Sequence, residues 1–223
     1  MTNPLAFSES ERAAVYRAIA ERRDMRHFKR EAIADDVLLR LLHAAHCAPS
    51  VGLMQPWRFI RITDATLRAA IHALAESERR ATANALGERE DEFLNLKVEG
   101  IRDCGELFVV ALMDRREQHI FGRRTLPQMD LASAACAIQN LWLAARAEGL
   151  GMGWVSLFEP TALAQLLRMP EDSEPIAIIC LGHVDAFYSA PMLQLERWRE
   201  PDALAHCLME NYWTATTDVD GDK

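Results

Sequence analysis

Two uninterrupted apolar runs limit what this chain can fold into. Residues 107–113 read LFVVALM and residues 176–181 read IAIICL, without a charged residue in either run. A strand with one face in water alternates apolar and polar side chains, so a continuous run predicts a strand buried on both faces. Each run is also about a third of the roughly 20 residues that a membrane-spanning helix needs. We therefore predict two inner strands of a sheet that helices cover on both sides.

Two helices are predicted ahead of these strands. Ser8 and Glu11 have the spacing of a capping box, and apolar residues then repeat at helical intervals for about three turns. That helix ends in the basic stretch ERRDMRHFKR. Asp35 and Asp36 can cap a second helix, which stops at Pro49 because proline cannot continue a helix.

A long apolar helix is predicted between the two apolar runs. It opens at Asp130 and is closed by Gly149, because glycine adopts the left-handed conformation after a helix at no steric cost. The helix is apolar on more than one face, which suits the centre of a dimer. Residues 57–63 and 151–158 read as further strands, and residues 161–169 as a short helix. Helices interleaved with four strands predict an α/β (α+β) sandwich with a mixed sheet.

The 223 residues are predicted to form one domain, residues 1–223, with three special segments. Residues 67–103 are polar and mostly helical, and they form either a solvated excursion or a cover over a site, of which we favour the cover. Residues 186–215 extend past the last strand as an arm with no partner in its own core. Residues 214–223 are expected to be a disordered tail.

Composition excludes several classes of function. The net charge of −8 repels polyanions, so nucleic acid is not expected as a partner. The five cysteines are odd in number and include no C-x-x-C pair, which favours free thiols in a reducing compartment. The starting residues MTNPLAFSESER lack the basic start and apolar core of a secretory signal. We therefore expect a cytoplasmic protein that does not enter a membrane.

An arginine cluster is the strongest local sign of a binding site. Arg22, Arg23 and Arg26 place rigid guanidinium forks around the end of the first helix, a geometry that suits phosphate oxygens. Cations at a helix C-terminus are also stabilised by the helix dipole and are often simply solvated. The cluster alone leaves both interpretations open. No Walker loop accompanies it, and GMG at 151–153 precedes a strand instead of opening a helix, unlike a dinucleotide-binding fingerprint.

Four motifs in order give the cluster a context. RRDMRHF at 22–28, APSVGLMQPWRF at 48–59, GLGMGWVS at 149–156 and PMLQLERWR at 191–199 together resemble the nitroreductase-like flavoprotein superfamily. The resemblance covers nearly the whole chain. It implies an FMN-dependent fold with a mixed, mainly antiparallel sheet flanked by helices, and a C-terminal arm exchanged in a homodimer. The FMN-binding residues that it implies are Arg22, Arg23, Met25, Arg26, Ser50, Met54, Gln55, Pro56, Leu96, Gly153 and Arg199.

Three details resemble the 5,6-dimethylbenzimidazole synthases within that superfamily. Asp24 stands where the reductases usually have serine, SVGLMQPW lacks the asparagine that reductases tend to carry before Q-P-W, and Ser156 follows the glycines. The resemblance implies an enzyme whose substrate is reduced FMN. Oxygen adds to the flavin, and the products are 5,6-dimethylbenzimidazole, the lower ligand of vitamin B12, and D-erythrose 4-phosphate. A separate NAD(P)H flavin reductase would supply the reduced FMN.

Asp24 and Ser156 are the catalytic candidates under this resemblance. A carboxylate held near the flavin by arginines can act as a general acid or base, and Ser156 can orient oxygen or a ribityl hydroxyl. Each residue has a plainer alternative, since Asp24 can simply neutralise the arginines and Ser156 can satisfy a backbone group. His27, His43 and His46 form no plausible metal set, so no metal is predicted.

Two other functions stay open at this point. An NAD(P)H-dependent nitroreductase would keep FMN as a prosthetic group and reduce a second molecule. A non-catalytic FMN carrier would return its flavin intact after reduction and exposure to air. Asp24 in place of serine counts against both functions.

Overall fold

The computed structural model describes residues 5–213 of the chain. The chain divides into two compact units, Met1–Tyr188 and Ser189–Lys223. Within the described residues, the first unit holds the whole sheet and the long helices. The tail predicted over residues 214–223 lies outside the described residues. None of the described helices is long and apolar enough to span a membrane.

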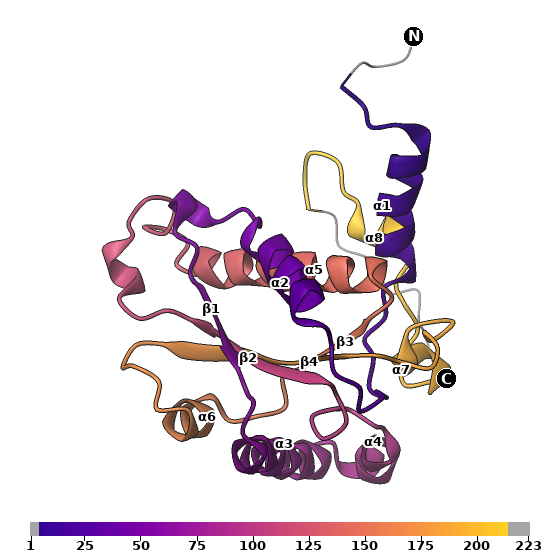
Figure 1. Cartoon of the computed structure of the whole chain (residues 1–223), viewed down its shortest axis with the longest axis vertical. Coiled ribbons are helices and arrows are strands. Elements are labelled where there is room, and N and C mark those ends of the chain that lie inside the picture. Colours follow the sequence, from indigo (N-terminus) through magenta and orange to yellow (C-terminus); the bar gives the residue numbers. More distant parts are fainter. Residues whose placement is uncertain (1–4, 214–223) are drawn as a thin grey trace. The chain divides into compact units, whose positions relative to one another are not determined.

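A four-stranded sheet lies at the centre of the first unit (Figure 1). Its strands in spatial order are β1 (Trp57–Arg61), β2 (Glu106–Leu112), β4 (Glu174–Gly182) and β3 (Gly151–Val155). Every neighbouring pair of strands is antiparallel. A parallel bridge joins Asp24, which lies outside these strands, to Met152 in β3. The predicted α/β (α+β) fold with a mixed, mainly antiparallel sheet is confirmed.

Helices cover both faces of this sheet (Figure 1). They are α2 (Asp35–His46) and α5 (Met129–Ala147) on one face, and α3 (Ala65–Ala85) and α6 (Pro160–Leu166) on the other. In β2, Phe108 and Val110 are buried among side chains of α2 and α5. Leu107 and Val109 alternate with them and are buried among side chains of α3 and α6. The continuous apolar run therefore reflects two buried faces, as expected.

The first two helices begin in different ways. Ser8 forms the predicted capping box at the start of α1 (Glu9–Glu21). The prediction that Asp35 and Asp36 cap α2 is wrong, because the N-cap is Ala34 and no side chain caps the helix. The two aspartates lie inside the first turn, where their charges still favour the positive end of the helix dipole.

The long helix α5 matches its predicted bounds closely. It begins at Met129, one residue before the predicted Asp130, and Gly149 follows it with φ +77° in the left-handed region. Asp130 is 5% exposed. Its carboxylate pairs with Arg116 at 2.9 Å and with Arg123 at 3.0 Å. The two guanidinium groups compensate the buried charge at the start of the helix.

The predicted helical segment of residues 67–103 contains α3 except for its first two residues, α4 (Glu90–Asn95) and a short turn between them. Ile71 and Ala75 of α3 are 0% and 2% exposed against the sheet, so α3 is a layer of the core and not a solvated excursion. Whether the rest of the segment covers a site stays a prediction.

The second unit contains two short helices among its described residues, α7 (Met192–Leu195) and α8 (Leu204–Cys207). It starts at Ser189, close to the predicted start of the arm at residue 186. Leu204 and Trp213 are 79% and 87% exposed. That this unit is an arm exchanged with a second copy stays a prediction.

Candidate functional site

The segment of residues 22–26 leaves α1 and lies against β3. Arg22 ends α1 with extended backbone angles, φ −60° and ψ 135°. Three residues after Arg22, the backbone N–H of Met25 donates to the carbonyl of Met152 at 2.9 Å, and Asp24 forms the parallel bridge to the same residue. The arginine motif and the glycine-rich motif, about 130 residues apart in sequence, therefore meet side by side.

The Asp24 carboxylate is bonded through both oxygens. Oδ1 accepts the backbone N–H of Trp154 at 3.0 Å, and Oδ2 forms a short ion pair with Nη2 of Arg26. The same Nη2 donates to the carbonyl of Trp154 at 3.2 Å. The Asp24 side chain is 39% exposed, whereas that of Arg26 is only 10% exposed. The carboxylate is thus held in one orientation and still reaches the surface.

The protonation of Asp24 depends on opposing effects. Desolvation by the surrounding chain raises the pKa of the Asp24 carboxyl and outweighs Arg26, the Trp154 N–H and Arg22, all of which lower it. A raised pKa brings a carboxyl group nearer to the range in which it can both hold and release a proton at neutral pH. Desolvation also lowers the pKa of Arg22.

Arg26 carries hydrogen-bonding capacity that the described chain does not use. Its Nε and Nη1 atoms are buried and have no hydrogen-bond partner among residues 5–213. Its backbone N–H donates to the Tyr188 hydroxyl at 3.2 Å, and that hydroxyl lies 2.7 Å from Nδ1 of His27. Buried guanidinium donors without acceptors are costly, so a bound anion or carbonyl group would complete this site.

Gly153 is required by the close approach of this segment. A Cβ atom at this position would lie 2.3 Å from the carbonyl oxygen of Met25 and 2.9 Å from Nη1 of Arg26. Backbone oxygen cannot move away as a flexible side chain would. The absence of a side chain therefore allows residues 24–26 to lie flat on β3.

Arg22 and Arg23 are held by α5 and by the end of α1. The Arg22 guanidinium stacks on the Trp142 ring, 4.5 Å from its centroid, and the Trp142 indole N–H donates to the carbonyl of Arg23 at 3.1 Å. Nη1 of Arg23 donates to the carbonyls of Ala20 and Arg22, each at 2.8 Å. Arg22 and Arg26 are therefore the better oriented cations, while Arg23 partly caps its own helix.

The loop of residues 50–56 is organised by Ser50. Its hydroxyl accepts the backbone N–H of Gln55 at 3.0 Å, and the N–H of the next residue, Val51, donates to Ser133 at the start of α5 at 3.0 Å. Met54 and Pro56 are buried, and the Gln55 amide lies 3.4 Å from His46. Ser50, Met54, Gln55 and Pro56 thus belong to one ordered loop, and their contact with FMN stays a prediction.

Within the described residues, this loop and the segment of residues 22–26 are anchored at separate points of α5. Ser133 anchors the loop at one end of α5, and Trp142 anchors residues 22–26 nine residues further along the same helix. Nine residues of helix correspond to about 13 Å. Figure 1 shows α1 beside one end of α5 and the chain that leads into β1 at the other.

The remaining predicted site residues lie in different places. Ser156 is exposed directly after β3, two residues beyond the backbone group that binds Asp24. Leu96 is 6% exposed at the C-cap of α4. Arg199 belongs to the second unit, where its exposed side chain lies 4.0 Å from Asp202.

Sequence reasoning missed the groups that hold Arg26 and the flanking backbone. Tyr188 bonds the backbone of Arg26 across 162 residues, and Trp142 bonds Arg23 across 119 residues. No local spacing links residues so far apart. Trp142 contacts the arginine motif through both its indole N–H and its ring.

Comparison with known proteins assigns the family. The model of the Nitroreductase family matches residues 19–183, which include residues 22–26, the loop of residues 50–56 and β3. The chain therefore belongs to the nitroreductase family. Solved structures agree: nitroreductase A from Vibrio parahaemolyticus has a TM-score of 0.70 at 20% identity, covering 95% of this chain and 79% of that one. An iodotyrosine deiodinase bound to FMN and 3-iodo-L-tyrosine has a TM-score of 0.68 at 21% identity, covering 90% of this chain and 100% of that one.

Curated relatives place the chain more narrowly within the family. It is 38% identical over 202 residues to a 5,6-dimethylbenzimidazole synthase of Rhodospirillum rubrum, covering 89% of this chain and 94% of the relative. It is 37% identical over 196 residues to one of Rhodobacter capsulatus, covering 87% and 95%. A putative NAD(P)H nitroreductase of Bacillus subtilis is 30% identical, covering 75% and 82%. The chain is thus an enzyme of the nitroreductase family that belongs with the 5,6-dimethylbenzimidazole synthases.

Proposed function

We propose that this enzyme fragments reduced FMN with molecular oxygen to give 5,6-dimethylbenzimidazole and D-erythrose 4-phosphate. The relatives named 5,6-dimethylbenzimidazole synthase support this activity. The observation that carries the proposal is the Asp24 carboxylate, fixed by Arg26 and by the Trp154 N–H beside the glycine-rich strand, with a raised pKa. The enzyme would act in the cytoplasm, where a separate NAD(P)H flavin reductase supplies the reduced FMN.

The residues around Asp24 fit an FMN molecule. Arg26 has two buried donor atoms without an acceptor among the described residues, and Arg22 presents a second guanidinium nearby. These groups would bind phosphate or carbonyl oxygens of the flavin nucleotide. Arg199, from the second unit, is proposed as a further phosphate ligand. The reduced flavin supplies the electrons for the reaction with oxygen.

Asp24 is proposed to move the protons that bond cleavage requires. Breaking carbon–carbon and carbon–nitrogen bonds in the ribityl chain and ring needs a group that can take up and release a proton. A desolvated carboxyl group with a raised pKa is suited to that task. Ser156 follows the same strand and would orient oxygen or a ribityl hydroxyl through its exposed side chain.

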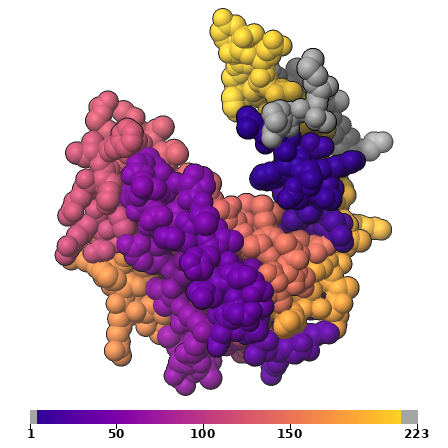
Figure 2. All heavy atoms as spheres, turned by 45° about the horizontal axis from the view of Figure 1, so that its top comes forward, coloured from indigo at the N-terminus to yellow at the C-terminus, as the bar shows by residue number. Residues whose placement is uncertain are grey.

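The complete site is proposed to form between two chains. The loop of residues 50–56 and the segment of residues 22–26 are anchored at different ends of α5. The loop lies beside the segment that carries Phe121 (Figure 2), and Leu53 and Phe121 are 80% and 84% exposed, an apolar surface that a second copy would cover. A homodimer would place the loop of one chain opposite residues 22–26 of its partner, and the C-terminal arm would exchange between the two.

The test is a direct search for the product. Purified protein is mixed in air with FMN, NADH and a separate flavin reductase, and 5,6-dimethylbenzimidazole is measured by chromatography over a range of pH. The matched control omits the protein but keeps the reductase. Absence of product at every pH would overturn the proposal.

The same mixtures separate the alternative functions. A stable yellow protein that bleaches with NAD(P)H alone, without added reductase, would identify a nitroreductase. Flavin recovered intact after reduction and aeration would identify a carrier. Loss of FMN together with formation of the benzimidazole is expected only for the proposed activity.

A further inference from the structure

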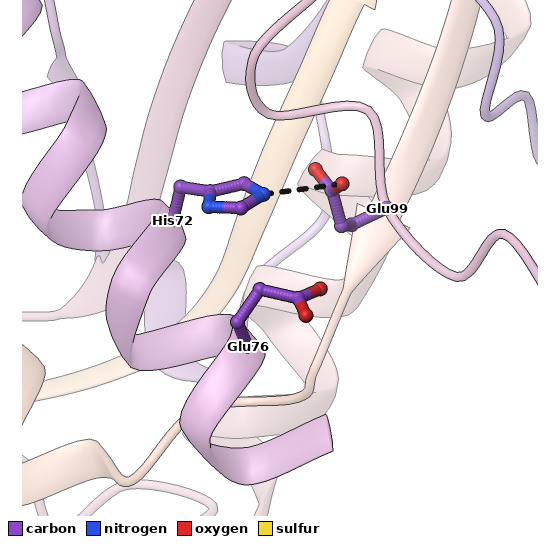
Figure 3. A group of neighbouring side chains, drawn as sticks. All are labelled: His72, Glu76 and Glu99. Carbon is purple, nitrogen blue, oxygen red and sulfur yellow. Dashed lines mark ion pairs between the residues drawn. The ribbon is translucent and has the colours of Figure 1, made fainter. Parts of the chain in front are cut away.

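His72, Glu76 and Glu99 form a cluster that the proposed chemistry does not use (Figure 3). One ligand atom from each side chain lies within 4.8 Å of the other two. We propose that this cluster binds a divalent transition-metal ion through one imidazole nitrogen and two carboxylate oxygens. The site would lie between α3 and the chain that connects α4 to β2.

Helical spacing and one backbone bond bring the three side chains together. His72 and Glu76 are four residues apart in α3, so they lie on the same face of the helix. Glu99 comes from the segment after α4, and its Oε2 accepts the backbone N–H of Ile101 at 2.5 Å. That bond fixes the carboxylate and leaves Oε1 directed at His72, with 3.5 Å between Oε1 and Nε2 (Figure 3).

The histidine is buried and weakly engaged. His72 is 8% exposed, and within residues 5–213 its ring nitrogens make no hydrogen bond. The Glu99 and Glu76 side chains are 16% and 29% exposed. Carboxylates that are partly removed from water and close together repel each other unless a cation lies between them. A metal ion would replace the long contact between His72 and Glu99 with a direct bond to the imidazole, and it would neutralise the carboxylates.

A neighbouring arginine compensates only part of this charge. Nη1 of Arg79 lies 3.2 and 3.4 Å from the two oxygens of Glu76, and its Nη2 donates to the carbonyls of Leu94 and Leu96. Arg79 therefore orients Glu76 in the way that an outer partner orients a metal ligand. Glu99 receives no such cation within the described chain, so a negative charge remains for the ion.

The ligand types indicate which ions fit. Imidazole nitrogen favours ions such as Zn²⁺, Co²⁺ and Fe²⁺ over Ca²⁺ and Mg²⁺, which prefer oxygen ligands alone. Three protein ligands leave at least one position for water. Water has access because surface clefts open on both sides of Glu76, one lined also by His72 and Arg80 and the other by Arg79 and Glu99.

The ion would fasten a segment that packs against the candidate active site. Gly100, next to Glu99, has no room for a side chain: a Cβ atom would lie 2.4 Å from the Phe28 ring and 3.1 Å from the carbonyl oxygen of Arg26. Linking Glu99 to α3 through a metal would therefore hold the chain that supports Arg26. The site itself does not depend on the proposed reaction.

Cobalt binding to untagged protein tests the proposal. Chelator-treated, FMN-free protein is titrated with Co²⁺, which reports its ligands by visible absorption, and bound metal is counted after dialysis. We expect one equivalent per chain, a weak d–d spectrum without the intense near-ultraviolet absorption of thiolate ligands, and a higher Tm with metal. The thiolate signal matters because Cys47, Cys136 and Cys207 are exposed.

Matched variants of one helix and one loop complete the test. Glu76→Gln and Glu99→Gln preserve side-chain shape and are expected to weaken binding at least tenfold, and His72→Ala to abolish it. Glu78→Gln is the control, because Glu78 is on the same helix but contacts Thr82. Normal binding in Glu99→Gln, a thiolate spectrum, or no binding by the wild type would each overturn the proposal.

Discussion

Residues 22–26 and the loop of residues 50–56 carry two of the family's motifs, but the fold holds them by different means. Residues 22–26 lie against β3, where backbone bonds, a carboxylate and the missing side chain of Gly153 leave little freedom. The loop is tied to α5 by the bond from Val51 to Ser133, and its last residue, Pro56, accepts the backbone N–H of Met113 at 2.8 Å. Residues 22–26 are thus organised by their own chain, whereas the loop buries Met54 and Pro56 but leaves Leu53 80% exposed.

The loop also holds its backbone in costly conformations. Leu53 and Gln55 have φ values of +54° and +48°, in the left-handed region that residues with a Cβ atom avoid. Each such residue costs about 1–2 kcal/mol. Strain of this kind persists where function requires a particular shape. Residues 22–26 are therefore held rigidly, whereas the loop of residues 50–56 is strained.

The largest expected effect is a loss of product formation, and it tests whether residues 22–26 carry the chemistry. Asp24→Asn is expected to lower formation of 5,6-dimethylbenzimidazole by about 100-fold or more, because it removes the proton-transferring group. FMN binding, measured by fluorescence titration, should change little, since Arg22 and Arg26 remain. Asp36→Asn is the control, because Asp36 is an exposed carboxylate paired only with Arg40. Turnover at the wild-type level in Asp24→Asn would remove Asp24 from the mechanism.

Mixing two inactive variants tests whether residues 22–26 of one chain and the loop of residues 50–56 of another form one site. Asp24→Asn is dissociated and reassembled with Gln55→Ala, after each is shown to have low activity alone. If one site uses Asp24 of one chain and Gln55 of the other, half of the dimers are mixed and each has one intact site, so about a quarter of wild-type activity returns. If each site lies within one chain, every site keeps a defect and no activity returns.

The sequence predicted the sheet and the arginine motif because their signals are local. A continuous run such as residues 107–113 is visible without knowing its neighbours, and a capping box needs only Ser8 and Glu11. The strand order and the bridge from Asp24 to Met152 join residues far apart in sequence, so no local pattern contains them.

Two features of the structure departed from the sequence predictions for different physical reasons. Asp35 was predicted to cap α2, but an acidic residue suits the first turn as well as the cap, so composition alone does not distinguish the two positions. The cluster of His72, Glu76 and Glu99 was overlooked. The spacing of His72 and Glu76 was visible, but Glu99 joins them only through the fold.

Substitution of Gly153, with an effect of intermediate size, tests how tightly residues 24–26 pack on β3. Gly153→Ala is expected to lower the free energy of unfolding by about 2 kcal/mol, because a methyl group would collide with the Met25 carbonyl. Gly149→Ala is the control, since its Cβ atom would meet nothing within 4 Å and the change introduces only left-handed strain. Urea unfolding measures both. Equal losses would mean that the approach of residues 24–26 to β3 tolerates a side chain.

A substitution that relieves backbone strain tests the loop of residues 50–56. Leu53→Gly is expected to raise the free energy of unfolding of the isolated chain by up to about 1 kcal/mol, because glycine adopts the left-handed conformation without cost. Leu39→Gly, a change at an exposed position inside α2, should instead destabilise the chain by about 1 kcal/mol. Destabilisation by Leu53→Gly in urea unfolding would show that the loop is not strained.

The smallest expected effect concerns the pH dependence of stability. The folded pKa of Asp24 lies above its ordinary value of 3.8, so the folded chain binds this proton more tightly than the unfolded chain. The resulting stabilisation is complete below pH 3.8 and is lost as pH rises through the folded pKa. The Tm of the wild type, relative to that of Asp24→Asn, should therefore rise as pH is lowered from neutrality toward 3.8. A relative Tm that falls over this range would mean that the ion pair with Arg26, and not desolvation, sets the pKa of Asp24. Asp24 would then hold no proton for catalysis near neutral pH.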